Sequence, residues 1–256
     1  MSFFALKILA LLSMLWDHAC DVWPLAMYLG DLLFPDPLGT SAASLVFQRA
    51  SAYLGRIAAP VFLFSLANGW RHTRDRRKYA LRLLVFACLA EGPYRLLFGM
   101  SGNILFTLLA GLLTLTLFEE GSRKRRGLGW VLAAAVILLA DWLCLTEGGG
   151  VYILYILVFH LTWDWPRGKR ALLWPFLLLL GHRGLTGWLI EAAWAGEVSY
   201  RLVHLWALNV LGPYLGVVVT LFYNGKPGVR FPGSKYIWYV AYPAHLAVLA
   251  AAAAAL

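Results

Sequence analysis

The stretch FFALKILALLSMLWDHACDV, residues 3–22, is apolar at most of its positions. A helix rises ~1.5 Å per residue, so a run of this length spans the ~30 Å hydrocarbon core of a bilayer. Asp17 and His18 interrupt the run, and no cleavage site of small residues follows it. We therefore interpret it as a first transmembrane helix and not as a signal peptide.

Similar apolar runs recur along the whole chain. Hydrophobic residues make up 61% of the 256 positions and charged residues 14%, whereas soluble domains carry about 45–50% and about 25%. The pattern predicts about nine helices, at residues 3–22, 44–70, 79–98, 103–118, 128–145, 150–163, 171–195, 200–223 and 236–256. The expected fold class is all-α, a polytopic transmembrane helix bundle that forms a single domain over residues 1–256.

The positive charge of the chain is a signal of topology. The formal net charge is +9, and most Lys and Arg residues lie in four short clusters between helices: residues 71–82, 123–126, 167–170 and 226–235. The loops between these clusters, 24–43, 99–102, 146–149 and 196–199, hold no Lys or Arg. The positive-inside rule then places the N-terminus in the cytoplasm of a multi-pass protein of the inner or plasma membrane. The lipid bilayer is an expected partner, and nucleic acid is not.

The cysteines do not suggest a redox or metal site. Cys20, Cys88 and Cys144 lie singly in apolar segments, without C-x-x-C spacing. We interpret them as packing residues and expect no metal.

Several ionisable residues fall inside the predicted helices. A charge near the bilayer centre costs about 2.5–3.5 kcal/mol on insertion scales, so such residues are candidates for function. Helix rise places His18 about 22 Å from the inner end of its helix, and Arg56 and Asp141 at about 20 Å. Further polar residues share the middle or outer half of the membrane: Glu91, Arg95, His182, Asn209 and His245. We expect them to line a polar cavity that opens outward.

The first helix carries the most informative group. Asp17 and His18 are adjacent, so they point ~100° apart and cannot form a catalytic pair directly. Asp21, three residues after His18, is placed to orient its ring, which leaves Asp17 to meet a cation such as Arg56. A purely structural polar contact between the first two helices is the alternative. Glu91 and Arg95, four residues apart, could likewise simply neutralise each other.

Several motifs, in order from the first helix to the last, resemble the TraX family. They are residues 6–8 and 16–18 (LKI and WDH), 55–60 (GRIAAP), 71–79 (RHTRDRRKY), 91–94 (EGPY), 103–107 (NILFT), 224–226 (NGK) and 242–246 (YPAHL). Residues 147–150 (EGGG) depart from the family pattern, in which a Tyr-Gly pair is expected. The family is named for N-terminal acetylation of conjugative pilin. It also resembles membrane acyltransferases that use cytoplasmic acetyl-CoA and place an essential His on an early helix.

The resemblance implies an acetyltransferase with acetyl-CoA as its donor. His18 would act as general base or transient acyl carrier, and Arg56, or Asn103 with Thr107, would stabilise the oxyanion. Glu91 and His245 are secondary candidates for orienting the acceptor. The donor phosphates would meet the basic residues Arg71, Arg74, Arg77, Lys78 and Lys226.

Two other classes of function remain open from the residues. A small-solute transporter or flippase could use the same Asp, His and Arg residues, although no inverted repeat is evident. A non-catalytic assembly subunit could use them as contacts between subunits. For an acetyltransferase, we expect the acceptor to be a peptide, a pilin-like subunit or a glycan. The sequence leaves open whether the chain forms a homo-oligomer.

Overall fold

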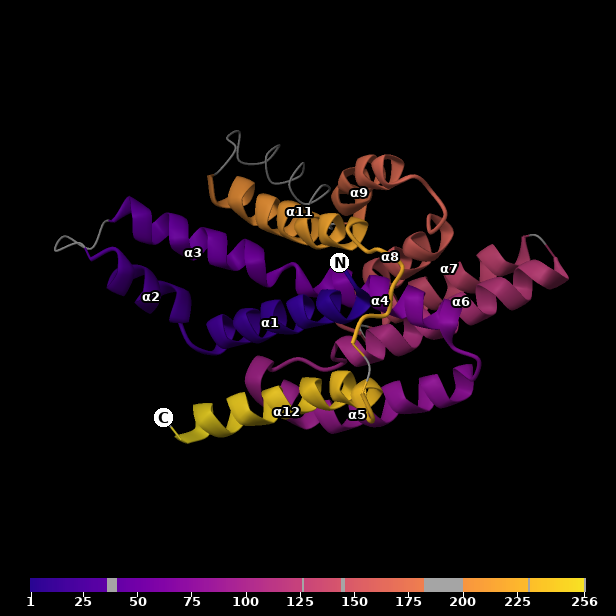
Figure 1. Cartoon of the computed structure of the whole chain (residues 1–256), viewed down its shortest axis with the longest axis horizontal. Helices are drawn as coiled ribbons and strands as arrows, with labels where there is room; N and C mark the ends of the chain where they lie inside the picture. Colours follow the sequence, from indigo (N-terminus) through magenta and orange to yellow (C-terminus); the bar gives the residue numbers. More distant parts are fainter. Residues whose placement is uncertain (36–40, 126, 144–145, 182–199, 230, 256) are drawn as a thin grey trace. The chain divides into compact units, whose positions relative to one another are not determined.

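The computed structural model describes residues 1–35, 41–125, 127–143, 146–181, 200–229 and 231–255. The helices are α1 (Phe3–Val22), α2 (Leu25–Leu33), α3 (Ala42–Gly55), α4 (Ala58–His72), α5 (Arg76–Phe98), α6 (Ile104–Lys124), α7 (Leu128–Trp142), α8 (Gly149–Leu161), α9 (Arg167–Gly181), α11 (Tyr200–Leu221) and α12 (Ser234–Ala255) (Figure 1). The described ranges contain no β-strand. The predicted all-α membrane bundle is confirmed.

Four stretches of the described chain are long and apolar enough to cross a membrane. They are Phe3–Val22, Ala42–His72, Ile104–Lys124 and Tyr236–Ala255. Shorter apolar helices cover Leu128–Trp142, Gly149–Leu161 and Val210–Leu221. The long spans agree with four of the helices expected from hydropathy, and the shorter ones fall where that pattern also indicated membrane segments.

The chain divides into two compact units, each made from two segments. Unit 1 contains Met1–Phe62 and Trp165–Gly228, and unit 2 contains Leu63–Asp164 and Val229–Leu256. α4 therefore begins in unit 1 and continues in unit 2. The assignment of residues 1–256 to a single functional domain stays a prediction.

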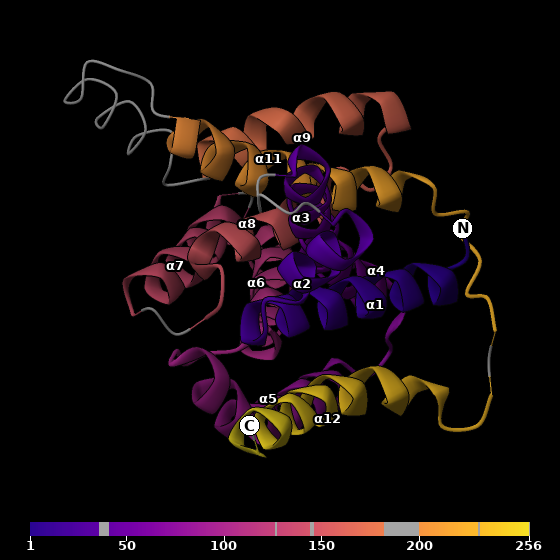
Figure 2. The ribbon, with the colours of Figure 1, turned by 90° about the vertical axis from the view of Figure 1, so that its left-hand side faces the viewer.

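In unit 1, α1, α2 and α11 all contact α3, and α9 lies along α11 (Figures 1 and 2). The α2–α3 contact depends on Gly30, because a Cβ there would lie 2.6 Å from Ser44 Oγ. The Ser44 hydroxyl donates to Asp31 at 2.8 Å and accepts from Gln48 at 3.2 Å. The Ser44–Asp31 bond thus joins α2 to α3, and the Gln48–Ser44 bond lies within α3.

The first residues of the chain pair with the segment that follows α11. The Phe3 N–H donates to the Lys226 carbonyl at 2.9 Å, and the Phe4 N–H donates to the Pro227 carbonyl at 3.1 Å. The Arg167 guanidinium donates to the Tyr223 carbonyl at 3.3 Å, which brings the start of α9 to the same place. Unit 1 thus gathers at one end three segments that the charge pattern assigns to one side of the membrane.

In unit 2, α12 lies along α5, and α6 contacts α5, α7 and α8 (Figures 1 and 2). The Phe86 and Tyr239 rings stack between α5 and α12, with centroids 5.6 Å apart. Glycines allow the closest approach of α6 and α7, because a Cβ at Gly121 would lie 2.9 Å from the Gly129 Cα. Small residues thus bring α6 and α7 together, while the fully buried core of unit 2 is mainly aliphatic, with Leu66, Leu83, Leu115, Ile153 and Ile156 among its members.

Three sequence-based boundaries need correction. The helix expected at residues 44–70 is broken after Gly55, so α3 and α4 replace it. The segment 24–43, expected to be a loop, contains α2. The helix expected at residues 171–195 begins earlier, as α9, and its part beyond Gly181 lies outside the described residues, as do His182 and Cys144.

Candidate functional site

The break between α3 and α4 has a cause in the sequence. Pro60 occupies the first turn of α4. Its ring supplies no N–H, so the carbonyl four residues earlier, that of Arg56, has no helical partner. A continuous helix through this point would also bring the Pro60 ring against that carbonyl. The apolar span therefore contains a short non-helical turn at Arg56 and Ile57.

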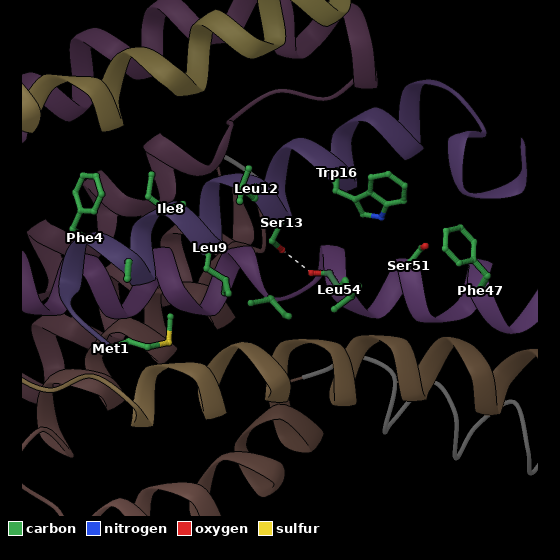
Figure 3. A pocket seen from close by; sticks show the side chains of 12 residues that line it. Met1, Phe4, Ile8, Leu9, Leu12, Ser13, Trp16, Phe47, Ser51 and Leu54 are labelled. Carbon is green, nitrogen blue, oxygen red and sulfur yellow. Dashed lines mark hydrogen bonds between the residues drawn. The ribbon is translucent and has the colours of Figure 1, made fainter. Parts of the chain in front are cut away.

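Ser13 of α1 satisfies the carbonyls near the end of α3. Its hydroxyl lies 2.6 Å from the Leu54 carbonyl oxygen and 3.0 Å from that of Gly55 (Figure 3). The last carbonyls of a helix lack intrahelical donors, and within a membrane they need another partner. Ser13 supplies a donor from the neighbouring helix, and the Ile57 N–H also donates to the Leu54 carbonyl at 3.3 Å.

Asp17 lies one turn beyond Ser13 and pairs with Arg56. The Asp17 Oδ2 and Arg56 Nη1 atoms are 3.7 Å apart, so the pairing expected from the sequence is confirmed. Gly55 is essential to this approach, because a Cβ there would lie 2.7 Å from the Asp17 Cγ. The WDH and GRIAAP motifs, which lie far apart in the sequence, thus meet at the break.

α11 holds the other side of Arg56 through two glycines. A Cβ at Gly212 would lie 2.6 Å from the Arg56 Cβ, and one at Gly216 would lie 2.6 Å from the Ile57 carbonyl oxygen. The Arg56 side chain keeps 41% of its surface exposed, while its Nε is buried and makes no hydrogen bond. The Arg56 side chain is therefore packed tightly at its Cβ, while its terminal Nη1 is only loosely paired with Asp17.

His18 and Asp21 flank the same part of α1. His18 is half-buried, and Asp21 is exposed but within the electrostatic reach of Arg56. The orientation of the His18 ring by Asp21 stays a prediction. Asn209 lies on α11, in unit 1, and Asp141 lies on α7, in unit 2. A cavity common to all these residues therefore also stays a prediction.

Glu91 in unit 2 is the centre of a second polar cluster. Its carboxylate accepts hydrogen bonds from Arg95 Nε at 2.8 Å, the Gly102 N–H at 3.0 Å and Asn103 Nδ2 at 2.9 Å. The ion pair with Arg95 that the sequence left as an alternative is present. Glu91 thus ties the end of α5 to the start of α6.

Asn103 and Thr107, expected near the thioester, are fully buried. The Asn103 side chain caps α6 by accepting from the Leu105 N–H at 3.1 Å, and its amide also donates to the Ala87 carbonyl. The Thr107 hydroxyl donates to the Glu147 carbonyl at 2.7 Å. Binding an oxyanion would require both residues to exchange these partners.

Residues from the EGGG segment (147–150) and from the YPAHL motif (242–246) lie close to the polar cluster around Glu91. Tyr94 hydrogen-bonds to Glu147, and the Tyr242 hydroxyl lies close to the backbone of Ile104, the first residue of α6. His245 is nearly buried, with Nδ1 3.0 Å from the Ala241 carbonyl oxygen. Motifs from α5, α6 and α12 therefore converge around the start of α6.

The basic segment between α4 and α5 is partly committed to internal contacts. The Arg71 guanidinium donates to the His160 carbonyl at 3.0 Å and lies 3.9 Å from Asp164. Lys78 pairs with Asp75 at 3.2 Å. Arg74 and Arg77 are exposed and take part in none of the ion pairs found among the described residues.

Asp75 also fixes the start of α5. Its side chain accepts from the Lys78 N–H at 2.9 Å. This backbone hydrogen bond, followed by the bond and charge of the Lys78 side chain, lowers the pKa of Asp75 below its usual value. The carboxylate therefore stays ionised at the N-cap, where it complements the positive end of the helix.

Unit 2 also holds a pair between the buried His160 and the half-buried Glu119, for which the sequence gives no local signal. His160 is 6% exposed, and its Nε2 lies 2.8 Å from Glu119 Oε1. Its ring meets Trp70 edge-on, and Arg76 lies 4.0 Å from the Trp70 ring centre. Glu119 lies on α6 and His160 on α8, far apart in the sequence, so no local sequence pattern indicates the pair.

Comparison with known proteins extends these observations. The chain is 30% identical to the probable fimbrial assembly protein FimC, serogroup H1, of Dichelobacter nodosus, over 98% of this chain and 95% of that relative. No solved structure matches the chain. The TraX protein family model matches residues 2–252, nearly the whole sequence. The chain belongs to the TraX family.

Proposed function

We propose that this chain is a membrane-embedded acetyltransferase that moves an acetyl group from cytoplasmic acetyl-CoA to an acceptor at or beyond the membrane. The family assignment and the name of the fimbrial relative support a surface-fibre subunit as the acceptor. A peptide with a free N-terminal amine is the simplest such acceptor, and a glycan hydroxyl is the alternative. The proposed location is the inner membrane, with the N-terminus in the cytoplasm.

One observation carries the proposal: Arg56, loosely paired with Asp17, lies at a break in a candidate membrane span, and His18 follows Asp17 directly on α1. An isolated anchoring charge has no need of this arrangement. Because the Asp17–Arg56 contact is 3.7 Å, longer than a hydrogen bond, the guanidinium can turn toward a developing negative charge at little cost.

The chemistry follows from these groups. Neutral His18 takes a proton from the acceptor as its amine or hydroxyl attacks the thioester carbonyl. Arg56 stabilises the oxyanion, and the C–S bond then breaks to release the CoA thiolate, which takes up the proton. Transfer through an acetyl-His18 intermediate is the alternative route. Arg56 is preferred to Asn103 and Thr107 here, because their donors already serve the start of α6.

The donor phosphates are proposed to bind the basic segment after α4. Arg74 and Arg77 are the stronger candidates, since Arg71 and Lys78 already have carboxylate partners. Arginine forks match phosphate oxygens in geometry and charge. Lys226 lies in unit 1 and is not part of this proposal.

The central experiment measures transfer by protein in lipid nanodiscs, with radiolabelled acetyl-CoA and a synthetic peptide that has a free N-terminus. His18→Ala should abolish transfer but keep donor binding, and Arg56→Ala should slow it by about 10²-fold. His72→Ala is the matched control, because His72 bonds locally to the Asn68 carbonyl. An active His18→Ala enzyme would refute the assignment of the base.

Donor binding is tested separately, by calorimetry with CoA. Replacing Arg74 and Arg77 together by Gln should weaken binding, whereas the same change at Lys124 and Arg125, in another basic segment, should not. Equal effects of the two pairs would mean that the segment after α4 contributes only to membrane orientation.

The interrupted α3–α4 span also favours a second candidate, a transporter or flippase. Transporters commonly place substrate at discontinuous membrane helices. The transfer assay separates the two, because a transporter moves solute across sealed vesicles without consuming acetyl-CoA.

A further inference from the structure

A groove in unit 1 lies between one face of α1 and the end of α3. Its volume is about 710 Å³, within the range of small-molecule sites. Figure 3 shows the residues that line it: Met1, residues of α1 from Phe4 to Trp16, and Phe47, Ser51 and Leu54 of α3. His18, Asp17 and Arg56 are not among its lining residues, so it is distinct from the charged cluster.

The chemistry of the lining selects a hydrocarbon occupant. The lining is aliphatic and aromatic except for Ser13 and Ser51. The Ser13 hydroxyl is already donated to the Leu54 carbonyl, and Ser51 is buried. A pantetheine arm or a peptide would leave amides without hydrogen-bond partners here, which is unfavourable. An alkyl chain carries no such cost.

The dimensions of the groove also suit one long chain. Met1 and Trp16 are separated by about 22 Å along α1, more than the ~15 Å of one hydrocarbon leaflet. If a methylene group takes roughly the ~30 Å³ of a water molecule, the groove holds about two dozen of them. Both helices that form it belong to candidate membrane spans, so the groove follows the direction of lipid chains.

The Met1 end of the groove is basic. The Phe3 N–H is bonded to the Lys226 carbonyl, and Arg167 is bonded to the neighbouring Tyr223. Residues 222–228, which pair with the start of α1, contain no acidic residue. A negatively charged headgroup at this end would therefore meet positive charge.

We infer that the groove binds one hydrocarbon chain of an anionic phospholipid, with the lipid phosphate at Lys226 and Arg167. The inner end of the chain lies against Ser13 and Leu54, which join α1 to the broken span. The bound lipid therefore covers this contact and acts as a structural part of unit 1. The inference concerns a site outside the proposed catalytic groups and holds for an enzyme or a transporter.

Native mass spectrometry of the detergent-purified protein, with no acetyl-CoA added, tests the inference. Added phosphatidylglycerol should leave one tightly held lipid per chain, and phosphatidylcholine should be retained much less. Leu12→Trp and Ala5→Phe fill the groove and should lower retention by about tenfold or more. Leu172→Trp is the matched control, because Leu172 of α9 is 73% exposed and lies outside the groove.

Two further measurements locate the lipid. A phosphatidylglycerol with a photoreactive group at its chain end should cross-link to peptides containing Trp16 or Leu54. Lys226→Gln should reduce the preference for phosphatidylglycerol over phosphatidylcholine without removing the cross-link. Equal lipid retention in Leu12→Trp and Leu172→Trp, or cross-links confined to other helices, would overturn the inference. Wild-type elution in size-exclusion chromatography confirms that each variant is folded.

Discussion

The approach of α1 to the broken span predicts an unusual effect of Gly55→Ala. The new Cβ would lie 2.7 Å from the Asp17 Cγ and 3.0 Å from the Asp17 Cβ. The carboxylate cannot avoid this contact by moving only its oxygen atoms. Asp17 must therefore turn away from Arg56, or α1 must move off α3.

The expected magnitude combines two opposing terms. Overpacking of this kind costs about 1–3 kcal/mol. Alanine gains up to about 1 kcal/mol over glycine in a helix interior, and less at the last residue of α3. The net loss of stability should be about 0.5–2 kcal/mol, since Asp17 Cγ lies well inside van der Waals distance. Asp17→Ala removes most of the overlap, so in that background the cost of Gly55→Ala should fall to about zero.

Thermal unfolding in detergent, followed by tryptophan fluorescence, provides the assay. A change of 1 kcal/mol should shift the midpoint by about 2–4 °C in a chain of this size. Gly92→Ala is the control, because a Cβ there meets nothing within 4 Å, and it should be neutral or stabilising. The reasoning fails if Gly55→Ala behaves like Gly92→Ala, or if its cost is the same with and without Asp17.

Three other predictions follow from described contacts. Ser13→Ala should cost about 0.5–1.5 kcal/mol in the same assay, because the end of α3 loses one hydroxyl donor while the Leu54 carbonyl keeps the Ile57 N–H. Ser13→Thr should restore part of the loss. Asn103→Ala should cost about 0.5–2 kcal/mol by removing the cap of α6, and it should leave CoA affinity unchanged if the residue is structural. Asp75 has a lowered pKa, so the stability that its carboxylate contributes is fully present above pH 3.8, the unfolded value, and is lost as the pH falls through the folded value. Wild type and Asp75→Asn should therefore reach equal stability only below the folded pKa of Asp75. A stability difference that persisted below that pH would contradict the assignment.

The overall architecture and one specific contact were predictable from the sequence. Apolar runs of sufficient length indicate membrane helices because an unpaired backbone is too costly in hydrocarbon. The Asp17–Arg56 pair was predicted because an unpaired charge inside the membrane is costly, and the two side chains lie 3.7 Å apart. Agreement was good wherever a single strong physical cost decided the outcome.

The break at Arg56 was not predicted, although Pro60 was a local signal for it. Hydropathy continues across the break, since Ala42–His72 has a mean hydropathy of 1.4, close to the 1.5–1.6 of the three spans without a break. The capping role of Asn103 and the His160–Glu119 pair depend on contacts between helices. No periodicity within one helix encodes which of its neighbours will supply a partner.

The interleaving of the two units has a consequence for biogenesis. Unit 1 is completed only by Trp165–Gly228, and unit 2 receives its last helix only from Val229–Leu256. During synthesis the ribosome therefore releases most of unit 2 well before α12, which lies along α5, is available. Until then the surface of α5 that contacts α12 stays uncovered. A ribosome stalled before residue 229 should hold a nascent chain that is inserted but still sensitive to membrane proteases.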